Sequence, residues 1–346
     1  MATLAPYGGK ILLTLNNSRC SRRKHEDVMP KIGIIYGMET SFPQALVDHI
    51  NTKRVPGVVA EHVKIGAVRI ADPSGYRVII DRVSHDIDFY RAYLRNAMLN
   101  GAIVINNPFW SSSDDRFFNY ALAHKLGMAV PRTVILPHKQ HPPGTSVQSM
   151  RNLVFPLDWD EVFHYVGFPA YLKAATRAGW SHVHRVENPE EFFAAYDESG
   201  ALCMMLQQAI HFGEYLRCYV VGQAKTHVMR YDPSQPHHLR YIRGGEVSSS
   251  ALCERVAKDS LSLCKALGLD FNTLEFAVHD GTPYVIDCVN SASDADMHLV
   301  GKENFQWAVE NIANLAIEKA LSSERPQLQY RWFHLLDPDP VLAGEK

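Results

Sequence analysis

Two acidic residues stand inside apolar stretches in the last quarter of the sequence. Glu275 lies in "TLEFAV", and Asp287 lies in "YVIDCVN", which ends with Asn290. A carboxylate within an apolar strand is costly unless it is paired or binds a cation. Two carboxylates and an amide oxygen are hard ligands of the kind that Mg²⁺ takes together with water and phosphate. These residue types therefore predict a magnesium site.

The spacing of the two carboxylates predicts a β-hairpin that brings them together. Matching the apolar faces of the strands requires a three-residue turn, Asp280–Gly281–Thr282, which places Glu275 opposite Asp287. A two-residue turn would place Glu275 opposite Ile286 instead. Directly opposed Cβ atoms lie about 4.5–5.5 Å apart, and carboxylates that close repel unless a cation bridges them. The alternative is a polar cluster in which arginines pair with both acids.

Elements from residue 31 to about residue 112 are expected to form a small parallel sheet. The apolar stretches "KIGIIYG" and "AIVINNP" alternate with helical patterns such as "SFPQALVDHINTK". This alternation is typical of a parallel sheet with helices on its faces. The first strand leads into "GIIYGMETSFP", which lacks the G-x-G-x-x-G fingerprint of dinucleotide binding. A nicotinamide-dependent oxidoreductase therefore loses its main support, and the sequence contains no P-loop motif.

The remaining sequence alternates helices with strands and hairpins. The stretch "DDRFFNYALAHKLG" is expected to be a helix that ends at its glycine. The strand "GFPAYLKAA" comes later, and "YLRCYVVGQAKTHVMRYD" is expected to be a hairpin. The long helix "SSSALCERVAKDSLSLCKALGLD" then precedes the acidic hairpin, and "ENFQWAVENIANLAIEKAL" reads as a closing helix.

This order of features resembles the ATP-grasp superfamily of carboxylate–amine ligases, in particular the ribosomal-protein glutamate ligase and glutathione synthetase types. The resemblance covers Asp115 to about Leu321. It implies an α/β (α+β) architecture in which an ATP-grasp fold at 113–325 follows a Rossmann-like pre-ATP-grasp domain at 31–112. Within the ATP-grasp part it implies a central lid subdomain at about 150–208 and a catalytic subdomain at about 209–325. Residues 1–30 are expected to be a disordered extension and 326–346 a tail.

The resemblance also implies ligands for ATP and for two Mg²⁺ ions. The metal ligands would be Glu275, Asp287 and Asn290, although the family usually has Asp first and Glu second. Lys173 in "GFPAYLKAA" would grip the α- and β-phosphates, since a lysine is a compact cation. Arg116 stands where the family has a phosphate-binding lysine, with a surface arginine as the alternative. The following loop, "ATRAGWSHV", is poorer in glycine than the family's phosphate-covering loop.

Other positions match the family's adenine, ribose and reaction sites. Gln207 would lie near the adenine amino group, and the backbone of Gln208, Ala209 and Ile210 would pair with the base edge. Glu214 would accept the ribose hydroxyls, whereas an alignment on Arg217 would put Tyr215 there instead. The resemblance assigns two catalytic arginines: Arg217, near the reacting phosphate, and Arg243, which would anchor the substrate carboxylate or acyl phosphate with Arg240 second.

The loop after Asn290 departs from the family pattern. Its sequence, "NSASDADMHLVG", lacks the Pro-Gly that usually follows the asparagine. Asp294, Asp296 and His298 add charge there, which could bind an amine substrate, form an outer shell around the metal or simply face solvent. The substrates therefore stay unidentified.

Composition excludes several partners. The net charge of −2 gives no field that favours nucleic acid or an anionic membrane, and no apolar run reaches the length of a membrane span. The six cysteines form no C-x-x-C pair, as is typical of free thiols in a reducing compartment, so we expect a cytoplasmic protein. The histidine pairs lack a matching cluster of zinc ligands.

The sequence leaves three classes of function open. The first is an ADP-forming ligase that activates a small-molecule carboxylate and joins it to an amine or peptide. The second is an ATP-binding module of the same fold that serves regulation or scaffolding without turnover. The third is the weakened oxidoreductase hypothesis. A homodimer is compatible with each of them.

Overall fold

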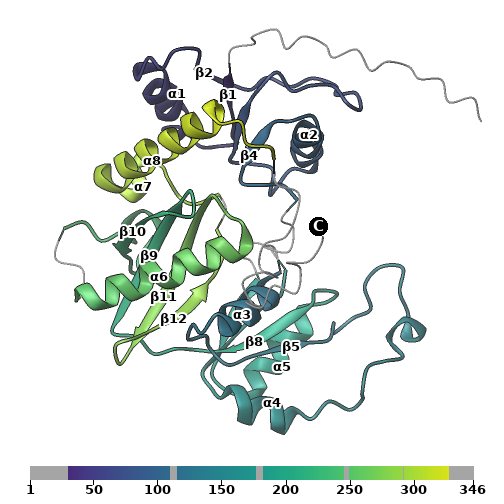
Figure 1. Ribbon diagram of the computed structural model, residues 1–346. Helices are drawn as coiled ribbons and strands as arrows, with labels where there is room; N and C mark the ends of the chain where they lie inside the picture. The colour runs from purple at the N-terminus through teal and green to yellow at the C-terminus, as the bar shows by residue number, and fades with distance from the viewer. Residues whose placement is uncertain (1–29, 110–114, 177–181, 245–248, 291, 327–346) are drawn as a thin grey trace, which may run out of the picture.

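The computed structural model describes residues 30–109, 115–176, 182–244, 249–290 and 292–326. The expected N-terminal extension and C-terminal tail lie outside these ranges except for residues 30 and 326. So do Trp180, in the glycine-poor loop after Lys173, and Gly245, in the loop that carries Arg243. The described residues form three four-stranded sheets, shown in Figure 1. None of their helices combines the length and apolar content that a bilayer crossing requires.

The first sheet is parallel, as the strand and helix alternation predicts. Its strands lie in the order β2-β1-β3-β4. Their bounds and those of the two intervening helices are β1 (Lys31–Ile35), α1 (Phe42–Thr52), β2 (Val59–His62), β3 (Val78–Asp81), α2 (Asp88–Leu99) and β4 (Ile103–Ile105). Strands β1, β3 and β4 are mostly apolar because helices bury both faces of the sheet, whereas the edge strand β2 carries Glu61 and His62. Helix α2 packs on the face that carries Ile79 and Val104.

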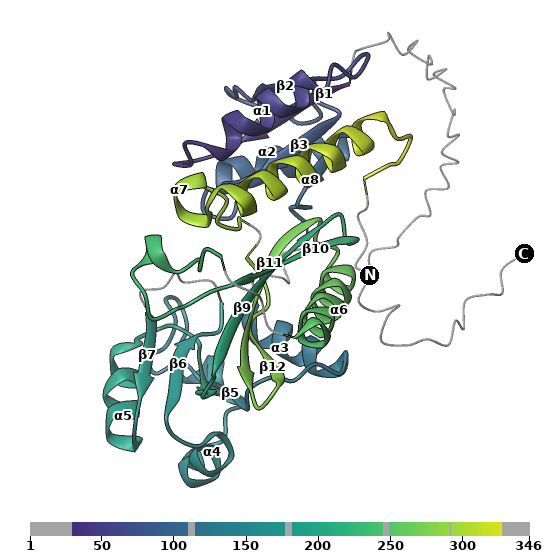
Figure 2. The same cartoon turned by 90° about the vertical axis from the view of Figure 1, so that its left-hand side faces the viewer.

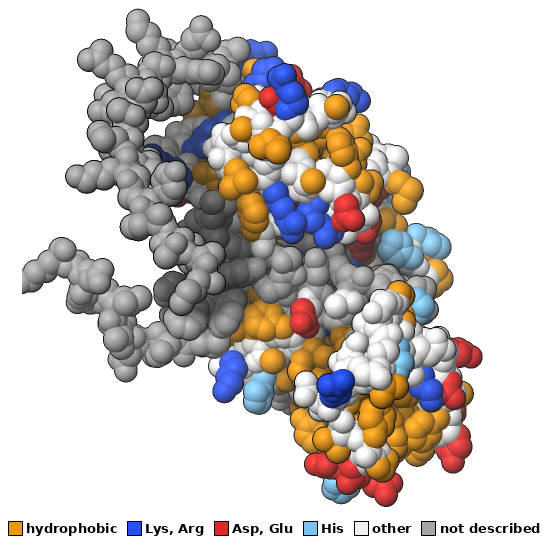
Figure 3. Space-filling view, turned by 90° about the vertical axis from the view of Figure 1, so that its right-hand side faces the viewer, with side chains coloured by type: hydrophobic (Ala, Val, Ile, Leu, Met, Phe, Trp, Pro, Cys, Tyr) orange, Lys and Arg blue, Asp and Glu red, His pale blue; other side chains and the backbone are white. Residues whose placement is uncertain are grey.

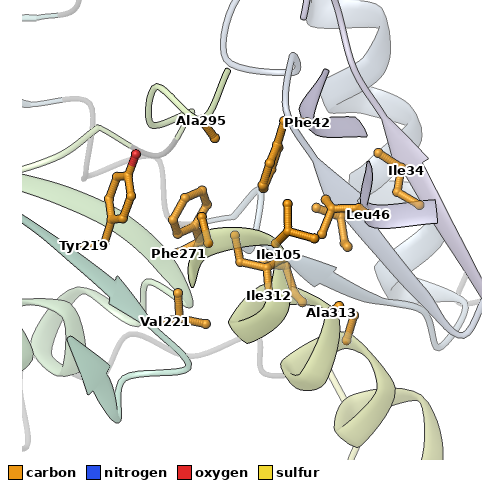
Figure 4. Close-up of a cluster of buried hydrophobic side chains, with 14 of the residues drawn as sticks. Ile34, Phe42, Leu46, Ile105, Tyr219, Val221, Phe271, Ala295, Ile312 and Ala313 are labelled. Carbon is orange, nitrogen blue, oxygen red and sulfur yellow. The ribbon is translucent and has the colours of Figure 1, made fainter. Parts of the chain in front are cut away.

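The opposite face of this sheet is covered by α1 together with α8 (Lys302–Leu321), the closing helix of the chain. Figure 2 shows α8 alongside α1 over the first sheet. The buried side of α8 carries alanines, and Ile312 and Ala313 lie in one cluster with Leu46 and Ile105 (Figure 4). Small side chains let the helix approach the sheet closely. The sequence identifies this helix but gives no sign that it covers strands far away in the chain.

The second sheet, which we call the lid sheet, is antiparallel and has the order β5-β8-β6-β7. Its elements are β5 (Thr133–Leu136), α4 (Trp159–Val166), β6 (Ala170–Ala174), β7 (Val183–Val186), α5 (Pro189–Glu198) and β8 (Met204–Gln208), and α3 (Arg116–Lys125) precedes them. The helices α4 and α5 bury Val166 and Phe192 against the sheet. Figure 3 shows hydrophobic side chains gathered on this lower part of the surface. The segment between β5 and α4 contributes Val154 and Phe155, which are 77% and 70% exposed.

The third sheet, which we call the core sheet, is also antiparallel, with the order β10-β9-β11-β12. Its elements are β9 (Glu214–Val221), β10 (Lys225–Arg230), α6 (Ser250–Leu267), β11 (Phe271–His279), β12 (Thr282–Asp287) and the short helix α7 (Met297–Val300). Ser249 caps α6 by accepting from the Leu252 N–H, and Gly268 ends it with a left-handed conformation. One face of the core sheet packs on α6, while Tyr219 and Phe271 on the other face join the cluster under α8.

Candidate active site

A cavity of about 200 Å³ lies between the lid sheet and the core sheet. Residues from β6, β8, β9, β11 and β12 line it, which are the elements that the sequence analysis identified as carrying chemistry. It brings together seven of the predicted site residues: Arg116, Lys173, Gln207, Gln208, Ile210, Glu275 and Asp287. A larger cavity of about 540 Å³, beside the end of α8, contains none of them.

The acidic hairpin pairs Glu275 with Asp287, as predicted, but by a different turn. The turn has two residues, Asp280 and Gly281, both with positive φ, which suits the Asp-Gly sequence. The three-residue turn was therefore a wrong prediction. The register shifts between Glu275 and Phe276, so that Ile286 is an extra residue on β12. This β-bulge restores the predicted pairing of the two carboxylates.

The bulge also changes which residues share a face of β12. Val285 is fully buried on the α6 side of the core sheet, although simple alternation predicts it on the same face as Asp287. Ile286 and Asp287 both line the cavity. The extra residue thus buries Val285 while keeping the Asp287 carboxylate toward the cavity.

Glu275 is held by two partners on β9. Its Oε1 forms an ion pair with Arg217, and its Oε2 accepts a hydrogen bond of 2.6 Å from the Tyr215 hydroxyl. Burial raises the pKa of Tyr215 well above its usual value, so this phenol remains a protonated donor. Glu275 is 5% exposed and Arg217 is 3% exposed. For Glu275, the arginine-paired alternative describes the geometry.

Asp287 has no such partner. Among the described residues, no hydrogen bond or ion pair reaches its carboxylate, which is half-buried and lines the cavity. The described residues contain no group of three or more His, Cys, Asp or Glu side chains arranged to hold a metal. Asn290 does not line the cavity, and its backbone N–H donates to Asn272 Oδ1 at 2.8 Å. One open and one engaged carboxylate fit a magnesium ion whose remaining ligands come from water and phosphate.

Lys173 extends from β6 into the same cavity. Its Nζ donates to the Tyr120 hydroxyl at 2.7 Å, and that hydroxyl donates to the Ile286 carbonyl. Burial lowers the pKa of Lys173 to about 8, an effect that the nearby Asp287 carboxylate partly offsets. Tyr120 thus links the lysine strand to the acidic hairpin.

Tyr120 was not among the residues predicted from the sequence. It lies four residues after Arg116 on α3, so the two side chains share one face of the helix. That spacing was the available signal. The Arg116 Nη1 donates to the Ala174 carbonyl at 3.2 Å, which holds the guanidinium beside the end of β6.

The segment predicted to bind adenine, residues 207–210, has several of its polar groups already hydrogen-bonded within the protein. The Gln207 side chain is buried and donates to Thr133 Oγ1 at 2.9 Å. The N–H groups of Gln208 and Ala209 donate to backbone carbonyls of Arg132 and Pro169, at 2.9 and 3.1 Å. Ala209 does not line the cavity, whereas Ile210, the next residue, does.

Arg217, Glu214 and Arg243, like Ala209 and Asn290, do not line the cavity. Arg217 is buried beside Glu275. For Glu214 and Arg243, a residue close by in the sequence lines the cavity instead. Glu214 shares a face of β9 with residues that pack on α6, and its charge raises the pKa of Cys253 on that helix, after the larger effect of burial. Tyr215 points into the cavity instead. Arg243 is exposed and donates to the His298 carbonyl at 3.1 Å, while Arg240 lines the cavity.

Solved structures share the fold of this chain. The structure is similar to a D-alanine–D-alanine ligase from Bacillus anthracis in complex with ATP, with a TM-score of 0.60, 17% identity, and 84% of this chain and 97% of that one covered. The chain has the ATP-grasp fold. A RimK domain ATP-grasp protein from Sphaerobacter thermophilus gives a TM-score of 0.57 at 16% identity, over 84% of this chain and 100% of that one.

A third ATP-grasp structure was solved with bound ligands. The ATP-grasp ligase PsnB, in complex with its minimal precursor, Mg and ADP, gives a TM-score of 0.56 at 14% identity, over 84% of this chain and 98% of that one. Comparison with protein-family models and with curated protein sequences finds no match. The likeness to ATP-grasp structures therefore concerns the fold, which matches the predicted architecture of a parallel-sheet domain followed by two antiparallel sheets.

Proposed function

We propose that the protein is an ATP- and Mg²⁺-dependent ligase that forms an amide or peptide bond and releases ADP and phosphate. The observation that carries this proposal is the open Asp287 carboxylate, which lines one cavity with Lys173 between the two antiparallel sheets of an ATP-grasp fold. An unpaired carboxylate beside a half-buried lysine suits a bound metal–phosphate group better than it suits a protein core.

The charges around the cavity support a bound triphosphate. Arg116, Lys173 and Arg240 line it together with the two carboxylates Glu275 and Asp287. The three cations would hold phosphate oxygens, while the carboxylates would hold magnesium. Bound magnesium would neutralise charge on the transferring phosphoryl group. Ile210 and the half-exposed Phe212 add apolar surface for a base at the hinge side.

The proposed reaction needs no nucleophile from the protein. An oxygen of the substrate carboxylate attacks the γ-phosphorus of ATP, and ADP leaves with the electrons of the broken P–O bond. The amine nitrogen then attacks the acyl carbon, inorganic phosphate leaves, and the nitrogen loses a proton. The protein's task is to hold the reactants in line and to balance the negative charge. We expect the carboxylate and the amine to be small molecules or peptides.

One observation favours the second candidate, a nucleotide-binding module without turnover. Both oxygens of Glu275 are engaged by Arg217 and Tyr215, so this carboxylate is available to a metal only if one of these bonds is exchanged. A module of this kind would bind Mg-ATP and release no ADP.

Product analysis decides between the two candidates. Mg-ATP is incubated with a panel of amino acids, polyamines and short peptides, and ADP and condensed products are measured by mass spectrometry. The ligase proposal expects ADP release that depends on both a carboxylate and an amine, and its loss in Asp287→Asn. Asp280→Asn is the matched control, because Asp280 has a 91% exposed side chain on the same hairpin. Mg-ATP binding without any condensation over the panel would favour the module, and absence of ATP binding would refute both.

A further inference from the structure

Asp294, in the loop between β12 and α7, contacts the core of the candidate site from outside the cavity. Its Oδ2 accepts from Arg217 Nη1 at 2.8 Å and from the Tyr241 hydroxyl at 3.3 Å. The Tyr219 hydroxyl donates to its carbonyl, so the backbone is fixed as well as the side chain. This loop is the part of the sequence that departs most clearly from the family pattern.

The contacts of this loop bear on two of the alternatives left open by the sequence. Asp294 is not a solvated loop residue, because its side chain is 24% exposed and bonded to Arg217. Asp296 accepts hydrogen bonds from Ser41 and Thr40 of the first domain and caps α7. An amine substrate would have to compete with Arg217 and Tyr241 for Asp294 Oδ2, or with Ser41 and Thr40 for Asp296 Oδ2.

Arg217 is therefore placed between two carboxylates. One terminal nitrogen of its guanidinium pairs with Glu275 and the other with Asp294, while its central carbon lies 3.9 Å from the centre of the Tyr231 ring. Its Nε is buried and has no hydrogen-bond partner among the described residues. The two terminal nitrogens thus anchor a side chain that is 3% exposed. One positive charge faces two negative charges.

A divalent cation at the acidic hairpin would change this balance. It would draw the Glu275 carboxylate away from Arg217, because both compete for the same oxygens. A buried guanidinium that loses its only carboxylate is strongly destabilised, whereas one that keeps a second carboxylate is not. Asp294 supplies that second carboxylate.

We propose that Asp294 is a positioning residue that keeps Arg217 in place when Glu275 turns toward a divalent cation. The inference rests on the proposed function, since it assumes magnesium and nucleotide at the cavity. It assigns the altered loop a role in metal binding through Arg217, without direct contact between Asp294 and substrate. Partners in the outer shell of a metal site commonly change metal affinity by about 10–100-fold when they are mutated.

The test is a Mg²⁺ titration at saturating ADP. The measured signal is the thermal unfolding midpoint of the whole protein at each Mg²⁺ concentration. Asp294→Asn keeps an acceptor for Arg217 but removes the charge, and it should raise the Mg²⁺ concentration at half-effect by about tenfold or more. Asp296→Asn is the matched control, since it removes the same charge from the same loop without a bond to Arg217. It should leave the Mg²⁺ half-point unchanged, and ADP binding in EDTA should be unchanged in both variants.

Three outcomes overturn the proposal. The first is an unchanged Mg²⁺ half-point in Asp294→Asn, and the second is an equal shift in both variants, which would show a general charge effect. If Asp294→Asn does not fold, Asp294→Glu replaces it and should raise the Mg²⁺ half-point by a smaller factor. An unchanged half-point in Asp294→Glu would then count against the proposal. The third is a wild-type protein that shows no Mg-ADP effect at all, which refutes the proposed function and this inference with it.

Discussion

Nucleotide binding should weaken as the pH rises above 8, because Lys173 loses the charge with which it would hold phosphate. The Lys173 ammonium has to be protonated to hold phosphate, and burial lowers its pKa to about 8. The protonated fraction falls from about nine-tenths at pH 7 to about one-tenth at pH 9, because each pH unit above the pKa costs about 1.4 kcal/mol. The affinity for ADP should therefore drop by about tenfold across this range. Binding should level off at lower pH, where the lysine is fully charged.

Isothermal titration calorimetry with ADP in EDTA measures this effect without magnesium. Lys173→Arg is the matched control, since an arginine stays charged over the whole range. Its ADP affinity should be flat between pH 7 and 9. A flat profile in the wild type, or an equal slope in Lys173→Arg, would refute the assignment of the lysine to phosphate.

The same group has the opposite effect on the protein without ligand. The folded state holds the Lys173 proton less tightly than the unfolded state does, because the folded pKa is the lower one. The contribution of this group to the free energy of unfolding therefore increases as the pH rises from about 8 toward 10.5, the usual pKa of a lysine. Urea unfolding of the wild type and of Lys173→Arg over this range separates it from other titrations.

Three further predictions concern the partners of this lysine and of Glu275. Asp287→Asn should abolish the Mg²⁺-dependent part of ADP binding and leave binding in EDTA nearly unchanged, as calorimetry in both buffers would show; an equal loss in both buffers contradicts the metal assignment. Tyr120→Phe should cost about 1–3 kcal/mol of unfolding free energy, because it leaves the Ile286 carbonyl without its donor, and urea unfolding would contradict this with a change below that range. Arg217→Met should cost about 3–5 kcal/mol, because two carboxylates lose their buried counter-charge; a neutral or stabilising result in the same assay would show that the network is not optimised for stability.

The hairpin shows how far sequence reasoning reaches in this protein. Alternation of apolar residues predicts that Glu275 faces Asp287, and the structure confirms that pair. It does so by another route, because a two-residue turn and a β-bulge replace the expected three-residue turn and regular alternation. The turn was wrong because the Asp-Gly sequence at 280–281 favours two residues, and because a bulge can absorb the difference. The sequence of β12 alone does not indicate that Ile286 is the extra residue of the β-bulge. Its position depends on the packing of Val285 against α6.

Register limited the other site predictions in a similar way. A shift of one residue along a strand moves a side chain to the opposite face. The position of Glu214, seven residues after Gln207, therefore could not exclude its neighbour Tyr215. Arg240 and Arg243 lie in a loop with no repeating pattern, where only the three-dimensional path decides which side chain reaches the cavity. Asp294 lies in the loop that departs from the family pattern. Its partner Arg217, on β9, is 77 residues away in the chain, so no local pattern indicates the contact.

The position of α8 has a consequence for how the chain folds while it is being synthesised. One face of the first sheet stays partly uncovered until residues 302–321 have left the ribosome, since α8 supplies much of the apolar surface that packs there. Domains usually fold as units in order of synthesis, and exposed apolar surface on a partly folded chain invites aggregation. The N-terminal domain of this protein cannot complete its core in that order. Fragments that end before residue 302 should therefore be recovered poorly, however well their own strands are formed.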